Sequence, residues 1–167
     1  MAATIVINEF NTAGETKTAN ITNSNMGSTD AVNLVAATYP VVPGENTYEK
    51  WQKVEVTAMG GSSVIDNIKI WRTTALGGSA VHLTNARETS YGGAETFETP
   101  IATDSSIATE TMPTSEPTDA NLGIGGSLTG TLTAAGSSDY LVHQIQTDAG
   151  DVVGASATMH YQYDETA

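Results

Sequence analysis

The chain contains no cysteine among its 167 residues. Disulfide bonds and metal sites built from thiolates are therefore excluded. Small secreted β domains often carry disulfides, so this absence favours assembly in a reducing compartment such as a cytoplasm. The length suits one domain, and a chain of this size buries about 70% of its unfolded surface without needing a covalent staple.

Long apolar runs are also missing. No stretch approaches the roughly 20 apolar residues that a membrane-spanning helix needs. The N-terminal stretch "MAATIVINEF" (1–10) has neither the basic start nor the long apolar centre of a signal peptide. We therefore expect a protein that is not exported through a signal peptide and has no membrane partner.

Basic residues are scarce and stop at Arg87. The chain has 6 Lys and Arg against 19 Asp and Glu, a net charge of −13. Residues 1–87 carry 7 acidic and 6 basic side chains, whereas residues 88–167 carry 12 acidic side chains and no basic one. Because phosphate binding depends on Lys and Arg, we expect no nucleic acid as a partner.

Catalytic and cofactor motifs are missing as well. His82, His143 and His160 form no H-x-H or H-E-x-x-H pattern, and we interpret each as an ordinary surface or strand histidine. The chain has no nucleophile elbow, P-loop, dinucleotide fingerprint or EF-hand loop. The stretch "DAGD" (148–151) fits a turn better than a calcium site. The sequence thus predicts that the protein is not an enzyme and holds no cofactor or metal.

What the chain does contain is typical of β-structure. Thr and Val favour strands, and glycine doublets at 60–61, 77–78, 92–93 and 125–126 punctuate them. Besides the pair described next, strands are expected at 4–10, 17–22, 30–39 (or a helical turn there), 79–84, 127–133, 139–147 and 152–165. We expect an all-β fold, an antiparallel β-sandwich of jelly-roll type.

Residues 48–58 and 64–72 form the clearest strand pattern, and the turn "MGGSS" (59–63) predicts that they pair as a hairpin. Alternation gives each strand one apolar face, made of Gln52, Val54, Val56 and Ala58 in the first strand and of Val64, Ile68 and Ile70 in the second. One register places Trp51 opposite Trp71, and a shift of two residues brings opposite charges side by side. In either register both tryptophans lie on the polar face.

Asp66 interrupts the alternation of the second strand, where it should point inward. We predict that it lies at the rim of the sandwich or in a β-bulge.

Two indoles on an outer face need a cover or a ligand, and three possibilities stay open. A loop or the 98–126 segment covers them, another subunit covers them, or they stack on a sugar ring. Arg72, next to Trp71, suits an interface as well as a glycan.

Residues 98–126 differ from the rest of the chain. They contain three prolines, five acidic residues before Ala120 and few core-forming side chains. We expect a β-sandwich part at 1–97, an extended acidic arm or loop at 98–126, and a three-stranded meander at 127–167 that completes the same domain. The arm is expected to be held by its own domain or by neighbouring subunits, and the domain is expected to fold without residues 101–120. Candidate interface residues are Trp51, Trp71, Arg72, Pro113 and Pro117.

The stretch "YEKWQKVEVTAMGGSSVIDNIKIWRT" (48–73) and the ending "YQYDET" (161–166) resemble small virion proteins of tailed bacteriophages. The likeness is to capsid decoration, or cement, proteins. This resemblance implies a compact β-fold on the capsid exterior, assembled in the host cytoplasm. Its partners would be the major capsid protein and other copies of itself, often as a homotrimer, and its arm would lie across neighbouring capsid subunits.

The stretch "IDNIKIW" (65–71) also resembles a strand of jelly-roll carbohydrate-binding modules and lectin-like sandwiches. The alternative expectation is therefore a carbohydrate-binding or receptor-binding module, such as a tail or head-fibre component.

Overall fold

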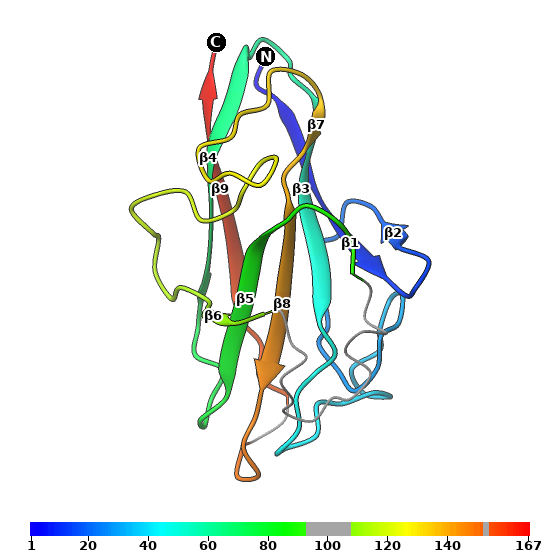
Figure 1. Cartoon of the computed structure of the whole chain (residues 1–167). Coiled ribbons are helices and arrows are strands. Elements are labelled where there is room, and N and C mark those ends of the chain that lie inside the picture. The colour runs from blue at the N-terminus through cyan, green and yellow to red at the C-terminus, as the bar shows by residue number, and fades with distance from the viewer. Residues whose placement is uncertain (93–107, 152–153) are drawn as a thin grey trace.

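A computed structural model describes residues 1–92, 108–151 and 154–167 and shows an all-β, antiparallel fold (Figure 1). Within these ranges the strands are β1 (Thr4–Asn11), β2 (Thr16–Thr18), β3 (Lys50–Ala58), β4 (Val64–Thr73), β5 (Val81–Glu88), β6 (Glu110–Thr111), β7 (Gly136–Ser137), β8 (Tyr140–Gln146) and β9 (Thr158–Thr166). The expected all-β fold class is confirmed. The described ranges contain no helix that could cross a membrane.

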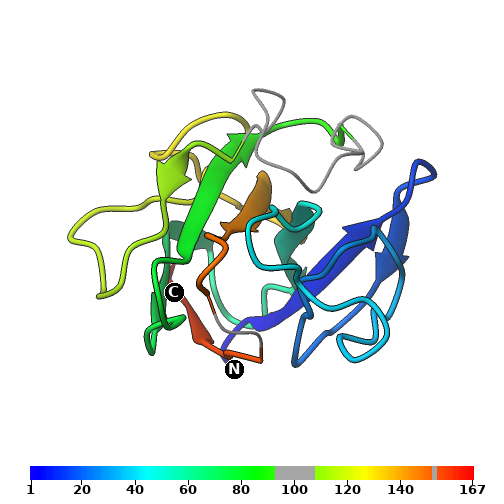
Figure 2. The same ribbon diagram turned by 90° about the horizontal axis from the view of Figure 1, so that it is seen from below.

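The strands form two sheets that pack into a sandwich-like arrangement, seen from below in Figure 2. The large sheet has the order β2-β1-β3-β8-β5-β6, with β7 also paired to β3, and the small sheet consists of β4 and β9. A jelly roll shares eight strands between two sheets in Greek-key order. The division into seven and two strands does not confirm that topology.

The predicted hairpin of residues 48–58 and 64–72 is wrong, although both strands exist. Strand β3 lies between β1 and β8 in the large sheet, whereas β4 pairs with β9 in the small one. The predicted apolar faces nevertheless meet, because Val54, Ile68 and Ile70 belong to one buried cluster. Alternation specifies which face of a strand is buried, and it does not specify the neighbouring strand.

The misfit at Asp66 is explained by the predicted β-bulge. The register of β4 against β9 shifts between Asp66 and Lys69, and Asn67 adopts a positive φ of 48°. The extra residue allows Ile65 and Ile68, three positions apart, to be buried together. In a regular strand these two side chains would point to opposite faces.

The predicted C-terminal meander is also wrong. Strand β8 lies between β3 and β5, and β9 lies in the other sheet beside β4. Residues 127–133 form no strand and contribute only two isolated bridges, Leu132 with Ile65 and Ser127 with Ile124. Of the inward face predicted for the last strand, Met159, Tyr161 and Tyr163 pack against the core, whereas Ala155 is exposed and precedes β9. Val153 of that face lies outside the described residues.

The other expected strands hold in part. The strand expected at 4–10 is β1, and the one expected at 79–84 is β5, which starts later and continues to Glu88. The strand expected at 17–22 is limited to β2. Residues 30–39 form turns instead of a strand.

The described part of the predicted arm, residues 108–126, belongs to the domain itself. Met112 and Leu122 are buried in the same cluster as Ile68 and Ile70. The backbone N–H of Leu122 donates to the carbonyl of Ile68 at 3.1 Å, and β6 pairs with β5. The described part is therefore held by its own domain, the first of the two expected alternatives. Folding without residues 101–120 stays a prediction, and the burial of Met112 argues against it. Residues 98–107 lie outside the described residues.

We predict that Met112→Ala lowers the free energy of unfolding by about 2–5 kcal/mol, because it leaves a cavity beneath the 108–126 segment. Urea denaturation monitored by tryptophan fluorescence measures this loss. Val35→Ala is the control, since Val35 is 57% exposed, and it should change stability by less than about 0.5 kcal/mol. An equally small effect of Met112→Ala would show that the segment is not part of the core.

Candidate functional site: a cavity between the sheets

The interior of the sandwich changes character along its length. Strands β3, β5 and β8 each place one apolar residue in the core, Val54, Ala86 and Leu141 respectively. Further along the same inward faces the buried residues are polar, namely Gln52 on β3, His82 on β5 and His143 on β8. These residues lie an even number of positions apart, so each pair shares one face of its strand. Beyond the apolar core, these inward positions of β3, β5 and β8 therefore carry polar side chains.

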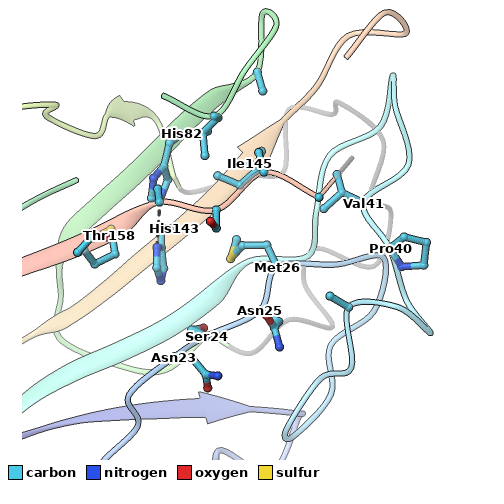
Figure 3. Close-up of a pocket in the computed structure, with 18 of the residues that line it drawn as sticks. Asn23, Ser24, Asn25, Met26, Pro40, Val41, His82, His143, Ile145 and Thr158 are labelled. Atoms are coloured by element: carbon cyan, nitrogen blue, oxygen red, sulfur yellow. Dashed lines mark hydrogen bonds between the residues drawn. The ribbon is translucent and has the colours of Figure 1, made fainter. Parts of the chain in front are cut away.

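A cavity of about 760 Å³ lies at this polar end. We call it the inter-sheet cavity. Its inner end carries His82, His143 and Ile145, and two segments wall it, Ile21–Met26 on one side and residues 154–159 on the other (Figure 3). Ala36, Pro40 and other residues of the loop between β2 and β3 extend the lining. The volume is in the range of pockets that bind ligands.

His82 and His143 form a buried pair in this cavity. Nε2 of His82 lies 3.1 Å from Nδ1 of His143, and the rings stack with centroids 5.3 Å apart. The remaining nitrogens, Nδ1 of His82 and Nε2 of His143, have no hydrogen-bond partner among the described residues. When both rings are neutral, one N–H is used in the hydrogen bond between them. The other N–H is then a free donor on one ring, and the unprotonated nitrogen of the other ring is a free acceptor, whichever ring donates.

Burial keeps both histidines neutral. Loss of solvation lowers the pKa of His143 to about 4, and the nearby Lys50 ammonium acts in the same direction. Loss of solvation also lowers the pKa of His82 to about 2, assisted by His143 and Arg72. At neutral pH the pair therefore carries no charge, and its two remaining ring nitrogens are free to hydrogen-bond an uncharged polar group.

Two other polar side chains of the cavity already have partners. The Tyr161 hydroxyl donates to Oε1 of Gln52 at 2.6 Å. The Asp151 carboxylate accepts from the backbone N–H groups of Ser79 at 2.6 Å and Asp148 at 2.8 Å. The "DAGD" stretch is therefore the predicted turn. The described residues contain no group of three His, Asp or Glu side chains arranged to hold a metal.

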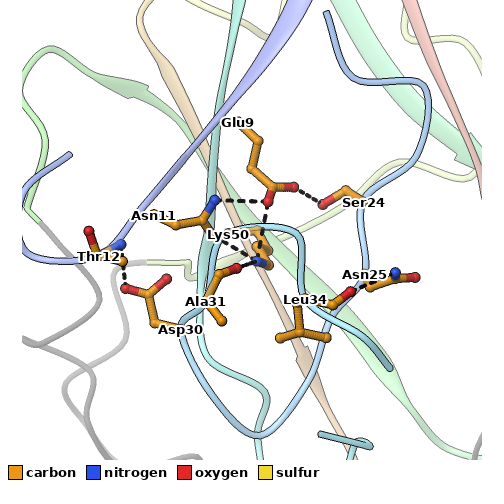
Figure 4. Close-up of polar contacts among 9 residues, drawn as sticks. All are labelled: Glu9, Asn11, Thr12, Ser24, Asn25, Asp30, Ala31, Leu34 and Lys50. Atoms are coloured by element: carbon orange, nitrogen blue, oxygen red, sulfur yellow. Dashed lines mark hydrogen bonds and ion pairs between the residues drawn. The ribbon is translucent and has the colours of Figure 1, made fainter. Parts of the chain in front are cut away.

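Lys50 anchors the loop that walls the cavity (Figure 4). Its ammonium donates to Oδ1 of Asn11 at 2.8 Å, to Oε1 of Glu9 at 3.3 Å and to the carbonyl of Ala31 at 3.3 Å. All three donors of the ammonium are satisfied. The Glu9 carboxylate in turn accepts from the Ser24 hydroxyl, within the wall itself.

The structure separates the two tryptophans that were expected to share a face. Trp51 is buried on the outer face of the large sheet, in edge contact with Tyr91 and Tyr140. Its own domain covers it, which is the first of the three possibilities considered. Trp51 is therefore not an exposed interface residue in this structure.

Trp71 lies on the outer face of the small sheet and remains partly exposed. It stacks on His160 of β9, with centroids 4.9 Å apart and planes 7° from parallel. Nε2 of His160 lies 2.9 Å from the Thr73 hydroxyl. These side chains form a small aromatic surface far from Trp51 in the fold.

The other candidate interface residues do not join this surface. Arg72 is buried, and its guanidinium donates to the carbonyl of Thr74 at 2.6 Å. The Pro113 carbonyl accepts from the backbone N–H of Arg72, so Pro113 helps to fasten the 108–126 segment to β4. Pro117 is partly buried in the same segment.

Sequence reasoning missed the His82–His143 pair, because the two residues are 61 positions apart. A signal was present, since His143 stands between Leu141 and Ile145 on the inward face of its strand. That face predicts burial for His143, but it does not predict its partner.

Comparison of the chain with protein-family models, curated proteins and solved structures finds no match.

We predict that stability falls as the pH is lowered from 7 to 5. An unfolded histidine titrates near pH 6.5, and both folded values lie lower, so the unfolded chain binds more protons throughout this window. Each histidine then lowers the free energy of unfolding by about 2 kcal/mol between pH 7 and pH 5. Urea denaturation at several pH values measures the slope.

His143→Gln should reduce this slope, because one buried group that must stay neutral is removed. The control His160→Gln replaces the partly exposed histidine on the outer face of β9 and should leave the slope intact. A flat profile for the unmodified protein would contradict burial of the pair.

Removing Lys50 should be far more costly than removing Lys17, although each pairs with a glutamate. Lys50→Ala leaves the buried Glu9 carboxylate unpaired and should lower the free energy of unfolding by about 3–5 kcal/mol. The Lys17 side chain is 42% exposed, so Lys17→Ala should cost less than about 1 kcal/mol. Equal effects in urea denaturation would contradict the role assigned to Lys50.

Proposed function

We propose that the protein is a non-enzymatic structural protein of a bacteriophage virion that decorates or cements the capsid. In this role many copies bind the capsid exterior and bridge neighbouring capsid subunits. Each copy adds buried surface between those subunits, so the shell resists internal pressure. The partners are then the major capsid protein and other copies of this chain.

The observation that carries this proposal is a set of exposed apolar side chains on segments that also contribute residues to the lining of the inter-sheet cavity. We call it the apolar rim, and it consists of Val32, Val35, Tyr39, Val42 and Val81. Its loop residues flank Ala36 and Pro40 of the cavity lining, and Val81 adjoins His82. Contiguous exposed apolar side chains mark contact sites for other proteins, and we infer that these five residues form such a site.

The position of the rim suits attachment by one end. Strand β5 begins at Val81, and β8 ends close to the same end of the sandwich. Both chain termini lie at the opposite end (Figure 1). A molecule attached through its rim would therefore project its termini away from the partner.

The net charge of −13 supports a protein partner over a nucleic acid. A strongly acidic protein that binds by an apolar rim stays soluble before assembly, because its remaining surface repels other copies.

A second candidate function rests on the Trp71–His160 stack. An exposed indole beside a histidine and the Thr73 hydroxyl is a surface on which a sugar ring can stack. Under this alternative the protein is a carbohydrate-binding or receptor-binding module. Glycan-array binding that is lost in Trp71→Ala would favour it, and absence of binding by the unmodified protein would remove it.

The test of the first proposal is to locate the protein on particles of the virus that encodes it. Gold-labelled antibody raised against the purified chain should label heads at many sites, and quantitative protein gels should give many copies per particle. Tyr39→Asp should reduce incorporation at least tenfold, because it places a charge in the apolar rim. The exposed Thr131→Asp in the 127–133 segment is the control.

Labelling confined to tails or fibres would contradict capsid decoration and favour the receptor-binding alternative. Particles without the protein would contradict both virion roles.

A further inference from the structure

The two strands of the small sheet differ in how their outer edges are covered. The outer edge of β4 is occupied, because the Pro113 carbonyl accepts from Arg72, the Ile68 carbonyl accepts from Leu122, and Ile65 and Leu132 exchange two backbone hydrogen bonds. On the outer edge of β9, no backbone hydrogen bond joins the strand to any part of the chain that the structure describes. Near the end of β9 the Glu165 side chain accepts from the N–H of Ala3 and from the Ser62 hydroxyl.

An open edge of this length is unusual. Strand β9 has 9 residues, and proteins commonly protect such edges with proline, lysine, bulges or a covering segment. The stretch "TMHYQY" (158–163) contains no proline and no charged Lys, Arg, Asp or Glu. Its row of backbone groups is therefore a template for another strand.

The inter-sheet cavity lies along this edge. Residues 154–159 and Tyr161 line one side of it, and Ile7 and Ile21–Met26 line the other. Figure 2 shows β9 close to the start of β1, on the side where the two sheets are not joined by paired strands. The open backbone edge and the apolar interior can thus be reached by the same segment.

We infer that the inter-sheet cavity receives an extended segment of a partner polypeptide, which pairs with the outer edge of β9 as an added strand. The backbone edge selects an extended chain, because its N–H and C=O groups repeat at strand spacing. Alternate side chains of that segment point inward onto Met26, Ile145 and Met159. An uncharged amide or hydroxyl side chain satisfies the free donor and acceptor of the histidine pair.

Charge complementarity favours a segment with basic residues over a second copy of this acidic chain as the occupant. The chain has a net charge of −13 and no basic residue after Arg87, and β9 itself ends in Asp164 and Glu165. A segment flanked by Lys or Arg is attracted to this end of the edge, whereas a second copy brings the same negative charge. The identity of the partner as a virion protein rests on the proposed function, but the open edge is a property of the isolated chain.

The first experiment measures amide hydrogen exchange of β9 by NMR in the purified protein. Alternate amides between residues 158 and 163 should exchange at least a hundredfold faster than their neighbours, because only every second one faces β4. Protection of all these amides would overturn the inference. Protection that increases with protein concentration would identify a second copy as the occupant and overturn the choice of partner.

The second experiment selects binders from a displayed library of random 12-residue peptides. The enriched peptides should alternate apolar residues and carry Lys or Arg at their ends, and a bound peptide should slow exchange of the open β9 amides at least tenfold. Ala157→Trp, which fills the cavity, should weaken binding at least tenfold. Ala134→Trp adds the same side chain at an exposed position outside the cavity and should not.

Exchange of the β3 amides checks that both variants are folded. An empty selection, peptides without this pattern, or binding that Ala157→Trp leaves unchanged would each overturn the inference. If peptides bind as expected but virions lack the protein, the proposed function fails and the strand-addition site stands. If virions carry the protein but all β9 amides are protected, the strand-addition site fails and the proposed function stands.

Discussion

The buried ion pair of Lys50 and Glu9 is the interaction on which the functional end of this molecule depends. It joins β1 to β3 and, through Ala31 and Ser24, ties the long loop between β2 and β3 to the large sheet. Two buried charges are costly unless every donor and acceptor is used, and this network uses all three ammonium donors. The wall of the inter-sheet cavity is therefore fixed by polar contacts where the chain has few apolar residues to do so.

The interior of the sandwich combines two environments with different tasks. The apolar cluster around Ile68 and Ile70 holds the two sheets together, and the 108–126 segment completes it with Met112 and Leu122. The other end contains a neutral histidine pair, whose low pKa values follow mainly from burial, with nearby positive charges acting in the same direction. Such an end is suited to hold an uncharged polar group, which agrees with the attachment role proposed above.

Much of the local structure could be predicted from residue order. The alternation of β3 and β4 correctly identified Val54, Ile68 and Ile70 as core residues, and the misplaced Asp66 correctly indicated a bulge. The hairpin failed because a five-residue turn can also carry the chain from one sheet to the other. The 98–126 segment was expected to be held by its own domain or by a neighbouring subunit, but its anchors Met112 and Leu122 were not identified, because two apolar residues are enough to hold the described part.

The sequence by itself determined the fold class, the inward position of Val54, Ile68 and Ile70, and the absence of basic residues after Arg87, because these depend on composition and on a period of two. Only the tertiary structure decided that Trp51 is covered while Trp71 is not, that His82 meets His143, and that β9 keeps an open edge. Each of these depends on which distant strands become neighbours. A strand can pair with any other strand that offers a free edge, and the local periodicity of a strand does not specify which one becomes its neighbour.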